Sequence, residues 1–359
     1  MSWIRLIAGN LLVLGILLLT AEVLLRVGWT VRGCVVARCS GAYLTQITNP
    51  DVLDFTATGL GLTRPDKTLG YVPRESFDAR ISDARGAWVD AQVSITPEGL
   101  RANDNQPRPT GARLLAVGDS FTFGAQVSNH ETWPACLERR LSQPVDNGGV
   151  FGYGAAQAVR RAMVLSAQQS YHTAILSVLV GADLIRDRHN YLGGYPRPAV
   201  IRTQGRATWA PTPDPMRAGT KYNPLGLTAS GALYQHSLLA FLIAKHLIGG
   251  VDVHGDRLTV VHPDAADEDV ILDFVLAQLA QLNVTRKVLV LQYASDLDTT
   301  QHVIRERRRW LAAARDRGLT VVDTLEALKG KVRKAIWRGH HTPRGNEIVC
   351  TVVHSALMR

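Results

Sequence analysis

Short apolar runs recur along the chain from residue 113 onward, and each has the length and continuous hydrophobicity of a strand buried on both faces. The runs fall at residues 113–118, 174–180, 287–293 and 319–322. Helix-like stretches alternate with them, at residues 132–141, 157–169, 268–282 and 300–317. Alternation at this spacing predicts an α/β domain whose parallel sheet is covered by helices on both faces. We expect this domain to span residues 111–359.

Two parts of the chain depart from this alternation. Residues 30–110 lack long helical patterns but carry turn signals and short alternating stretches such as 90–95, which predict a small N-terminal extension with a few β-strands. Residues 188–265 are first rich in Gly, Pro and Arg and then contain an apolar helical stretch at 237–248, too short for a membrane span. We interpret 188–265 as an insertion beside the carboxyl edge of the sheet, where substrate-shaping loops belong.

The N-terminus is apolar in a different way, because residues 6–25 form one run in which only Asn10, Thr20 and Glu22 are polar. This is about the length that crosses a bilayer as a helix. No small-x-small cleavage site follows the run, so the pattern favours an uncleaved transmembrane anchor at residues 1–29 over a removable signal peptide. Basic residues on both sides of the run leave its orientation open.

Charge and residue spacing exclude several functions. The 359 residues include 40 Lys and Arg against 31 Asp and Glu, a formal net charge of +9. The basic residues are scattered and no nucleic-acid-binding motif accompanies them, so we expect no nucleic-acid partner. No histidine or cysteine spacing fits a metal site, and no GxGxxG pattern is present, so we expect neither a metal nor a cofactor.

The four cysteines fall into two pairs with different settings. Cys34 and Cys39 share a short loop after the predicted anchor, and they either close a disulfide in an oxidising compartment or remain two free thiols. Cys136 and Cys350 stand in apolar helical stretches, where cysteine usually behaves as a small core residue. We therefore interpret the second pair as core residues.

The strongest chemical signal is GlyAspSerPheThrPheGly at residues 118–124, directly after the first buried run. A serine at such a strand-to-helix turn projects its hydroxyl from the carboxyl edge of the sheet, beside backbone N–H groups that can hold an oxyanion. Ser120 is therefore a candidate nucleophile. On these residues alone, a serine that only caps a helix explains the motif equally well.

Further motifs strengthen the case for Ser120, and together they resemble the sequence blocks of the SGNH/GDSL hydrolases. Residues 118–120 match the first block of that family, and residues 147–157 resemble the second, in which a Gly amide helps to form the oxyanion hole. Gly152 is the best match to that Gly. HisHisThrProArgGlyAsn at residues 340–346 resembles the final block, and its spacing makes His340 the general base.

The resemblance implies a three-layer, flavodoxin-like parallel sheet, which is the SGNH hydrolase fold. It also implies that Ser120 attacks an acyl carbonyl, that His340 takes and returns the proton, and that the amides of Ser120 and Gly152 hold the oxyanion. The chain is most similar to membrane-anchored members from bacterial envelopes, whose catalytic domain lies on the periplasmic or extracytoplasmic side. Envelope proteins are then possible partners.

Two positions depart from the family pattern. Ala182 stands where the third block carries an Asn that donates to the oxyanion, and losing such a donor costs on the order of 100- to 1000-fold in rate. Trp337 and Arg338 stand where an Asp usually orients the base, and Arg338 should lower the pKa of His340 by repulsion. Asp323 either supplies a carboxylate from elsewhere or is an ordinary turn residue at the end of a strand.

Two functions are consistent with these residues. The first is a serine-dependent acyl-ester hydrolase or O-acyltransferase that acts on an acylated envelope glycan or lipid. The second is a catalytically degenerate member that binds a glycan or an envelope partner without turning it over. Hydrogen-bond reach between Ser120 Oγ and His340 Nε2 would favour the first function, whereas Trp337 or Arg338 filling that gap would favour the second.

Overall fold

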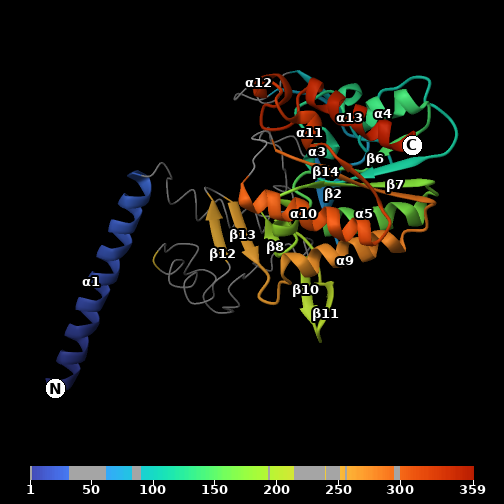
Figure 1. Ribbon diagram of the computed structural model, residues 1–359. Coiled ribbons are helices and arrows are strands. Elements are labelled where there is room, and N and C mark those ends of the chain that lie inside the picture. The colour runs from blue at the N-terminus through green and yellow to red at the C-terminus, as the bar shows by residue number, and fades with distance from the viewer. Residues whose placement is uncertain are drawn as a thin grey trace.

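A parallel sheet of five strands forms the centre of the computed structural model, which describes residues 2–31, 62–82, 90–192, 195–213, 239, 251–254, 257–294 and 300–359 (Figure 1). The strands are β5 (Leu114–Val117), β6 (Val145–Asn147), β7 (Thr173–Leu179), β14 (Arg286–Gln292) and β15 (Thr320–Asp323). Their order in the sheet is β6-β5-β7-β14-β15, and every neighbouring pair runs parallel. Counted along the chain, this is the 2-1-3-4-5 order of flavodoxin-like sheets, as predicted.

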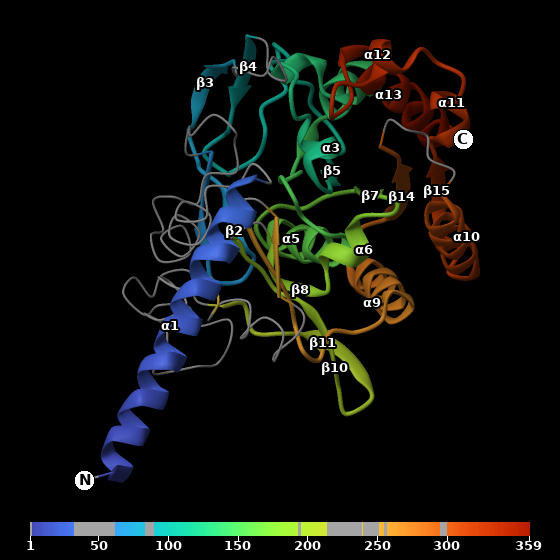
Figure 2. The ribbon, with the colours of Figure 1, turned by 90° about the vertical axis from the view of Figure 1, so that its left-hand side faces the viewer.

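Helices cover both faces of this sheet, so the predicted three layers are confirmed (Figures 1 and 2). One face carries α5 (Ala155–Gln168), α9 (Glu268–Gln281) and α10 (Gln301–Asp316), and the other carries α4 (Trp133–Leu141) and α13 (Pro343–Leu357). Strand β5 shows why both faces are apolar. Leu115 and Val117 pack into the first core cluster and Leu114 and Ala116 into the second, because successive strand residues point to opposite faces.

Two short antiparallel hairpins precede the α/β domain, in agreement with the predicted strand-containing extension. They are formed by β1 (Thr63–Asp66) with β2 (Gly70–Pro73) and by β3 (Asp78–Ile81) with β4 (Ala91–Ser94). The second hairpin packs its apolar side chains, including Ile81 and Val93, against Phe123 and Phe151. The extension thereby contacts the segment that follows β5, through Phe123, and the segment that follows β6, through Phe151.

The stretch 188–265 is mainly β-structure where it is described. Its strands are β8 (His189–Leu192), β9 (Tyr195–Pro196), β10 (Val200–Thr203), β11 (Arg206–Trp209), β12 (Val251–His254) and β13 (Arg257–Val261). Four of them form a sheet in the order β12-β13-β8-β9, and β10 and β11 form a separate hairpin. The predicted apolar helix at 237–248 lies, apart from Leu239, outside the described residues.

The N-terminal apolar run is helical, within α1 (Ser2–Val31). The large apolar side chains described on this helix are exposed, for example Leu12 at 66% and Leu19 at 67%. Among the residues that the structure describes, no helix meets the length and hydropathy needed to cross a bilayer. The transmembrane anchor stays a prediction, and Cys34 and Cys39 lie outside the described residues.

Cys136 and Cys350 are core residues, as interpreted from the sequence, and they also form a disulfide that the sequence did not predict. Helices α4 and α13 lie side by side on one face of the sheet and bring the two Cα atoms to 6.1 Å across a sequence separation of 214 residues. Both residues remain buried. The bond links the helix that follows the Ser120 turn to the helix that follows His340.

Candidate active site

Ser120 lies at the carboxyl end of β5, at the first position of the short helix α3 (Ser120–Phe123). The side chain of Asp119 caps this helix by accepting a hydrogen bond from the Phe121 amide. The turn requires Gly118, because a Cβ at that position would lie 2.6 Å from the carbonyl oxygen of Ser177. Ser120 is therefore placed by the backbone at the strand end, and only 6% of its surface is exposed.

His340 comes from the loop between α12 (Arg333–Ile336) and α13, and its Nε2 lies 2.8 Å from Ser120 Oγ. Its backbone amide donates to Gln126 Oε1 at 3.2 Å, and its ring packs against Phe121 with 5.0 Å between ring centres. These two contacts come from segments directly after the nucleophile turn. The fold thus brings Ser120 and His340, the two residues predicted from the sequence, within hydrogen-bond reach of each other. Neither Trp337 nor Arg338 lies between them.

The other ring nitrogen of His340 has no partner. Nδ1 is buried, and no described residue hydrogen-bonds to it. Asp323, the alternative carboxylate, instead accepts from Tyr293 Oη at 2.9 Å and from Arg307 Nε at 2.7 Å. It is a structural ion-pair partner at the end of β15. Within the described part of the chain, the pair of Ser120 and His340 therefore has no third member of the kind found in a complete triad.

The electrostatic environment of His340 favours its neutral form. Burial, followed by the positive charge of Arg186, lowers the pKa of His340 to about 4 from an ordinary value of 6.5. Repulsion was expected, but from Arg338, whose side chain is exposed. A neutral imidazole at physiological pH can accept the Ser120 proton, although a low pKa weakens it as a base.

His341 is the neighbour that does not reach the nucleophile. Its Nε2 lies 3.3 Å from the carbonyl oxygen of Tyr293. Its ring also packs edge-on against the Phe121 ring, with 4.9 Å between ring centres. Burial lowers its pKa to about 4 as well. The assignment of His340 over His341 from motif spacing agrees with this geometry.

Two backbone amides at the site are free to donate. Neither the Ser120 amide nor the Gly152 amide has a hydrogen-bond partner among the described residues. Gly152 has φ +66°, which glycine adopts without strain, and its carbonyl accepts from Arg197 Nη1 at 3.0 Å. Arg197 belongs to the 188–265 stretch, and its role in holding this loop could not be predicted from a motif.

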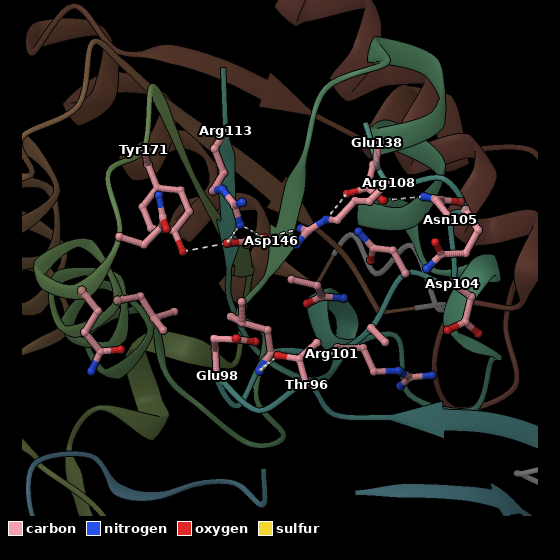
Figure 3. Close-up of a pocket in the computed structure, with 18 residues that line it drawn as sticks. Thr96, Glu98, Arg101, Asp104, Asn105, Arg108, Arg113, Glu138, Asp146 and Tyr171 are labelled. Carbon is pink, nitrogen blue, oxygen red and sulfur yellow. Dashed lines mark hydrogen bonds and ion pairs between the residues drawn. The ribbon is translucent and has the colours of Figure 1, made fainter. Parts of the chain in front are cut away.

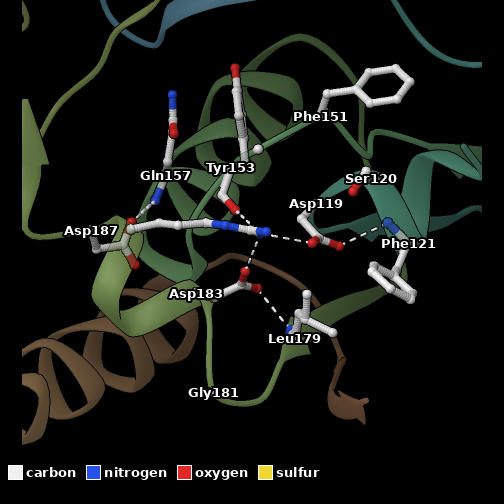
Figure 4. A network of polar contacts seen from close by, with 12 residues as sticks. Asp119, Ser120, Phe121, Phe151, Tyr153, Gln157, Leu179, Gly181, Asp183 and Asp187 are labelled. Atoms are coloured by element: carbon white, nitrogen blue, oxygen red, sulfur yellow. Dashed lines mark hydrogen bonds and ion pairs between the residues drawn. The ribbon is translucent and has the colours of Figure 1, made fainter. Parts of the chain in front are cut away.

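Arg186 joins the two loops that carry these amides. Figure 4 shows its labelled partners Asp119, Tyr153 and Asp183 gathered at one place beside Ser120. It ends α6 (Asp183–Arg186), one turn after Ala182. Its Nη1 donates to Asp119 Oδ2 at 2.8 Å, to Asp183 Oδ1 at 2.7 Å and to the Tyr153 carbonyl at 3.2 Å. No sequence motif pointed to Arg186, because its partners, apart from Asp183, are more than 30 residues away along the chain.

A pocket of about 420 Å³ lies elsewhere, at the amino edge of the sheet (Figure 3). Arg113 and Tyr171, which precede β5 and β7, line it, so it opens at the end of the strands opposite Ser120. Asp146 at its wall accepts from Arg108, from Arg113 and, at 2.9 Å, from Tyr171 Oη. The pocket therefore does not belong to the Ser120 site.

One group of residues has the composition of a metal site. Single ligand atoms of Glu268, His302 and Glu306 lie within 4.8 Å of one another. However, the oxygens of Glu306 accept from the Gly181 amide and from Trp310 Nε1, and Glu268 pairs with Arg309. The carboxylates of the cluster thus have partners within the protein, whereas His302 Nε2, at 3.5 Å from Glu306 Oε2, has no hydrogen-bond partner among the described residues.

Comparison with known proteins gives structural similarity only. No protein-family model and no curated protein sequence matches the chain. A protein of the G-D-S-L lipolytic family from Desulfitobacterium hafniense is similar, with a TM-score of 0.38 and 14% identity over 68% of this chain and 99% of its own. A member of the same family from Veillonella parvula has a TM-score of 0.41 and 12% identity, over 69% of this chain and 100% of its own.

An acetylxylan esterase from Geobacillus stearothermophilus is also similar, with a TM-score of 0.37 and 14% identity over 69% of this chain and 95% of its own. The first two of these neighbours are described as members of the G-D-S-L family, whose sequence blocks the chain resembles. At such TM-scores and identities, the function of this chain has to be argued from its own residues.

Proposed function

We propose that this protein is a serine-dependent ester hydrolase of the SGNH type, with Ser120 as nucleophile and His340 as general base. The observation that carries the proposal is the 2.8 Å separation of Ser120 Oγ and His340 Nε2 at the carboxyl edge of the sheet. A serine that only caps a helix has no need of this partner, and here Asp119 provides the cap. Ser120 is therefore available for chemistry.

In the proposed reaction, Ser120 Oγ bonds to the carbonyl carbon of an ester while His340 Nε2 takes the hydroxyl proton. The carbonyl electron pair moves onto oxygen, where the amides of Ser120 and Gly152 can stabilise the charge. Collapse of this intermediate breaks the ester C–O bond, and His340 returns the proton to the leaving alcohol. A water, or an acceptor hydroxyl in the acyltransferase variant, then releases the acyl group from Ser120.

The unpartnered His340 Nδ1 limits the rate of this reaction. No carboxylate among the described residues stabilises the imidazolium that forms, a loss worth roughly 10,000-fold in the serine-protease example. We therefore propose a slow enzyme, or one that acts on esters with good leaving groups.

We further propose that the substrate is an O-acylated carbohydrate or lipid outside the cytoplasm. The Cys136–Cys350 disulfide supports such a compartment, because structural disulfides persist under oxidising conditions and are rare in the cytosol. The net charge of +9 suits an anionic membrane surface or an acidic polysaccharide.

A second candidate function is binding without turnover. The absence of a carboxylate at His340 and the alanine at 182 favour it, because both losses weaken catalysis and neither prevents a glycan from binding. An inactive protein that retains affinity for envelope glycans would support this function.

Ester turnover by the full chain in mild detergent separates the two candidates. We expect release of p-nitrophenol from p-nitrophenyl acetate, and release of acetate from peracetylated sugars, at rates that fall to background in Ser120→Ala. Wild-type rates equal to those of Ser120→Ala on every ester would contradict the hydrolase. Glycan binding by both proteins would then support the binder.

A further inference from the structure

The oxyanion hole of the proposed esterase lacks one side-chain donor. Ala182 occupies the position at which the resembled family carries an Asn, and a methyl group cannot donate a hydrogen bond. Ala182 immediately precedes α6, and the same short helix ends in Arg186. The guanidinium group of Arg186 carries five N–H donors, so a replacement donor is available one turn further along the chain.

The contacts of Arg186 place its guanidinium between the two halves of the hole. Asp119, which accepts from Nη1 at 2.8 Å, is the residue before Ser120. Tyr153, whose carbonyl accepts from the same Nη1 at 3.2 Å, is the residue after Gly152. One nitrogen of Arg186 therefore contacts the immediate neighbours of both free amides.

Arg186 retains donors that nothing in the described part of the chain uses. All of its hydrogen bonds leave from Nη1, whereas Nε and Nη2 donate to no described residue. Its side chain is also 22% exposed, although both carboxylates that pair with it are almost fully buried. The group is thus held rigidly on one edge and accessible on the other, as expected of a preorganised donor.

We propose that Arg186 supplies the oxyanion donor that Ala182 cannot, which makes it a third catalytic residue beside Ser120 and His340. This inference rests on the proposed esterase function. Arg186 also carries a full positive charge, so it stabilises a negative tetrahedral oxygen more strongly than a neutral amide does. Asp119 and Asp183 hold the guanidinium in place and thereby fix the donor before the substrate arrives.

The same charge has an opposite effect on the base. Arg186 disfavours the imidazolium form of His340 while it favours the oxyanion, so the site trades base strength for oxyanion stabilisation. An enzyme of the common type has an Asp beside His and an Asn at the hole. In this chain the family positions of both the Asp and the Asn hold other residues. Arg186 compensates for the missing Asn but not for the missing Asp.

The first test adds the missing Asn to the intact protein. Ala182→Asn leaves every described contact of Arg186 in place, so it does not threaten the fold. If Arg186 already fills the hole, kcat for p-nitrophenyl acetate should change by less than about threefold. A rise in kcat on the order of 100-fold, the usual effect of one oxyanion donor, would show that the hole lacked this donor before the substitution. That result would overturn the proposal.

The second test removes the donor and then restores one. In Arg186→Gln, kcat should fall about 100-fold or more with KM little changed. Adding Ala182→Asn to this variant should recover at least tenfold of that loss. A structural role predicts no such recovery, because Asn at 182 cannot replace the ion pairs of Arg186 with Asp119 and Asp183.

The charge gives an additional readout. The acid limb of the kcat/KM profile should move to higher pH in Arg186→Gln, because removing a positive charge raises the pKa of His340. In Arg186→Lys, which keeps the charge, the acid limb should stay in place. Arg307→Gln is the matched control, since Arg307 also pairs with a carboxylate, that of Asp323, away from Ser120. It should lower thermal stability without changing kcat.

The outcomes separate this inference from the function on which it rests. Ser120-dependent turnover with an unchanged kcat in folded Arg186→Gln would leave the esterase standing and overturn the role of Arg186. If Arg186→Gln does not fold, the Ala182→Asn result decides. Absence of any Ser120-dependent turnover in the wild type would remove both.

Discussion

The two edges of the central sheet each hold a buried aspartate paired with arginine, but they differ in how many nearby polar groups lack a hydrogen-bond partner. At the amino edge, Asp146 accepts from two arginines and from Tyr171, and the adjoining Glu138 accepts from the Val145 amide. At the carboxyl edge, Asp119 also pairs with an arginine, yet the Ser120 and Gly152 amides and His340 Nδ1 stay without partners in the described chain.

The pocket of about 420 Å³ lies at the edge where Asp146 and Glu138 have their partners, although Asn103 Oδ1 in its lining has none among the described residues. The candidate chemistry lies at the other edge, around Ser120 and His340. Buried polar groups without partners are rare and costly, so several of them around one serine indicate a ligand that completes them. Single buried atoms without a described partner also occur elsewhere, for example Trp133 Nε1 and Ser166 Oγ. At the carboxyl edge, however, they gather around one candidate nucleophile, and this coincidence points to the functional site.

The largest difference between the edges should appear when the base is removed. His340→Gln should lower Ser120-dependent turnover by roughly 1000- to 10,000-fold, because no other described group lies within reach of Ser120 Oγ to take its proton. His341→Gln is the matched control, since the His341 ring packs on the same Phe121 but its Nε2 faces the Tyr293 carbonyl and not Ser120. Equal losses in the two variants, at equal thermal stability, would contradict the assignment of His340.

At the amino edge, the expected effect is on stability and not on rate. Asp146→Ala leaves Arg108, Arg113 and Tyr171 Oη without their common acceptor and should cost about 1–3 kcal/mol of unfolding free energy. The cost is moderate because the two arginine side chains are 43% and 31% exposed and Arg108 keeps its ion pair with Glu138. Turnover per folded molecule should stay within about twofold of wild type. Denaturant unfolding and active-site titration measure the two quantities separately. A tenfold loss of turnover in the folded variant would show that the two edges are coupled.

A carboxylate placed beside the base should sharpen the contrast from the other direction. Trp337 stands three residues before His340, where the resembled family carries its Asp. Trp337→Asp should raise kcat about tenfold and raise the pKa of His340, because a negative charge stabilises the imidazolium. Trp337→Asn, which lacks the charge, is the control. A gain of equal size in both variants would point to relief of crowding instead.

The smallest effect concerns pH in the wild type. Burial and Arg186 lower the pKa of His340 to about 4, so the base should stay neutral well below physiological pH. We expect kcat/KM at pH 5.5 to lie within about twofold of its value at pH 7.5, whereas a histidine of ordinary pKa would give about a tenfold drop. A drop of that size, in assays with the pH-independent hydrolysis subtracted, would contradict the environment described for His340.

The sequence was enough to predict what depends on local pattern. Apolar runs predicted β5, β7, β14 and β15, and the spacing of short motifs predicted that Ser120 and His340 belong together. The three-residue strand β6 (Val145–Asn147) was missed, because it is too short to show a period.

What could not be predicted depends on tertiary packing. The Cys136–Cys350 bond arises because α4 and α13 lie on the same face of the sheet, which neither flanking sequence reveals. Arg186 has no motif of its own, and its place between Asp119 and Tyr153 exists only once three loops meet at one strand edge. Missing family residues can be seen in a sequence, but their replacements can be seen only in a structure.

The central claim is that Ser120 is an activated nucleophile despite an incomplete triad, and covalent labelling tests it most directly. The full chain in mild detergent would be treated with a fluorophosphonate probe beside Ser120→Ala, with intact mass and peptide mapping as readouts. The account predicts one adduct per chain, on Ser120, that is absent from Ser120→Ala and strongly reduced in His340→Gln. A folded wild-type protein that takes up no probe, or takes it up equally in Ser120→Ala, would contradict the claim.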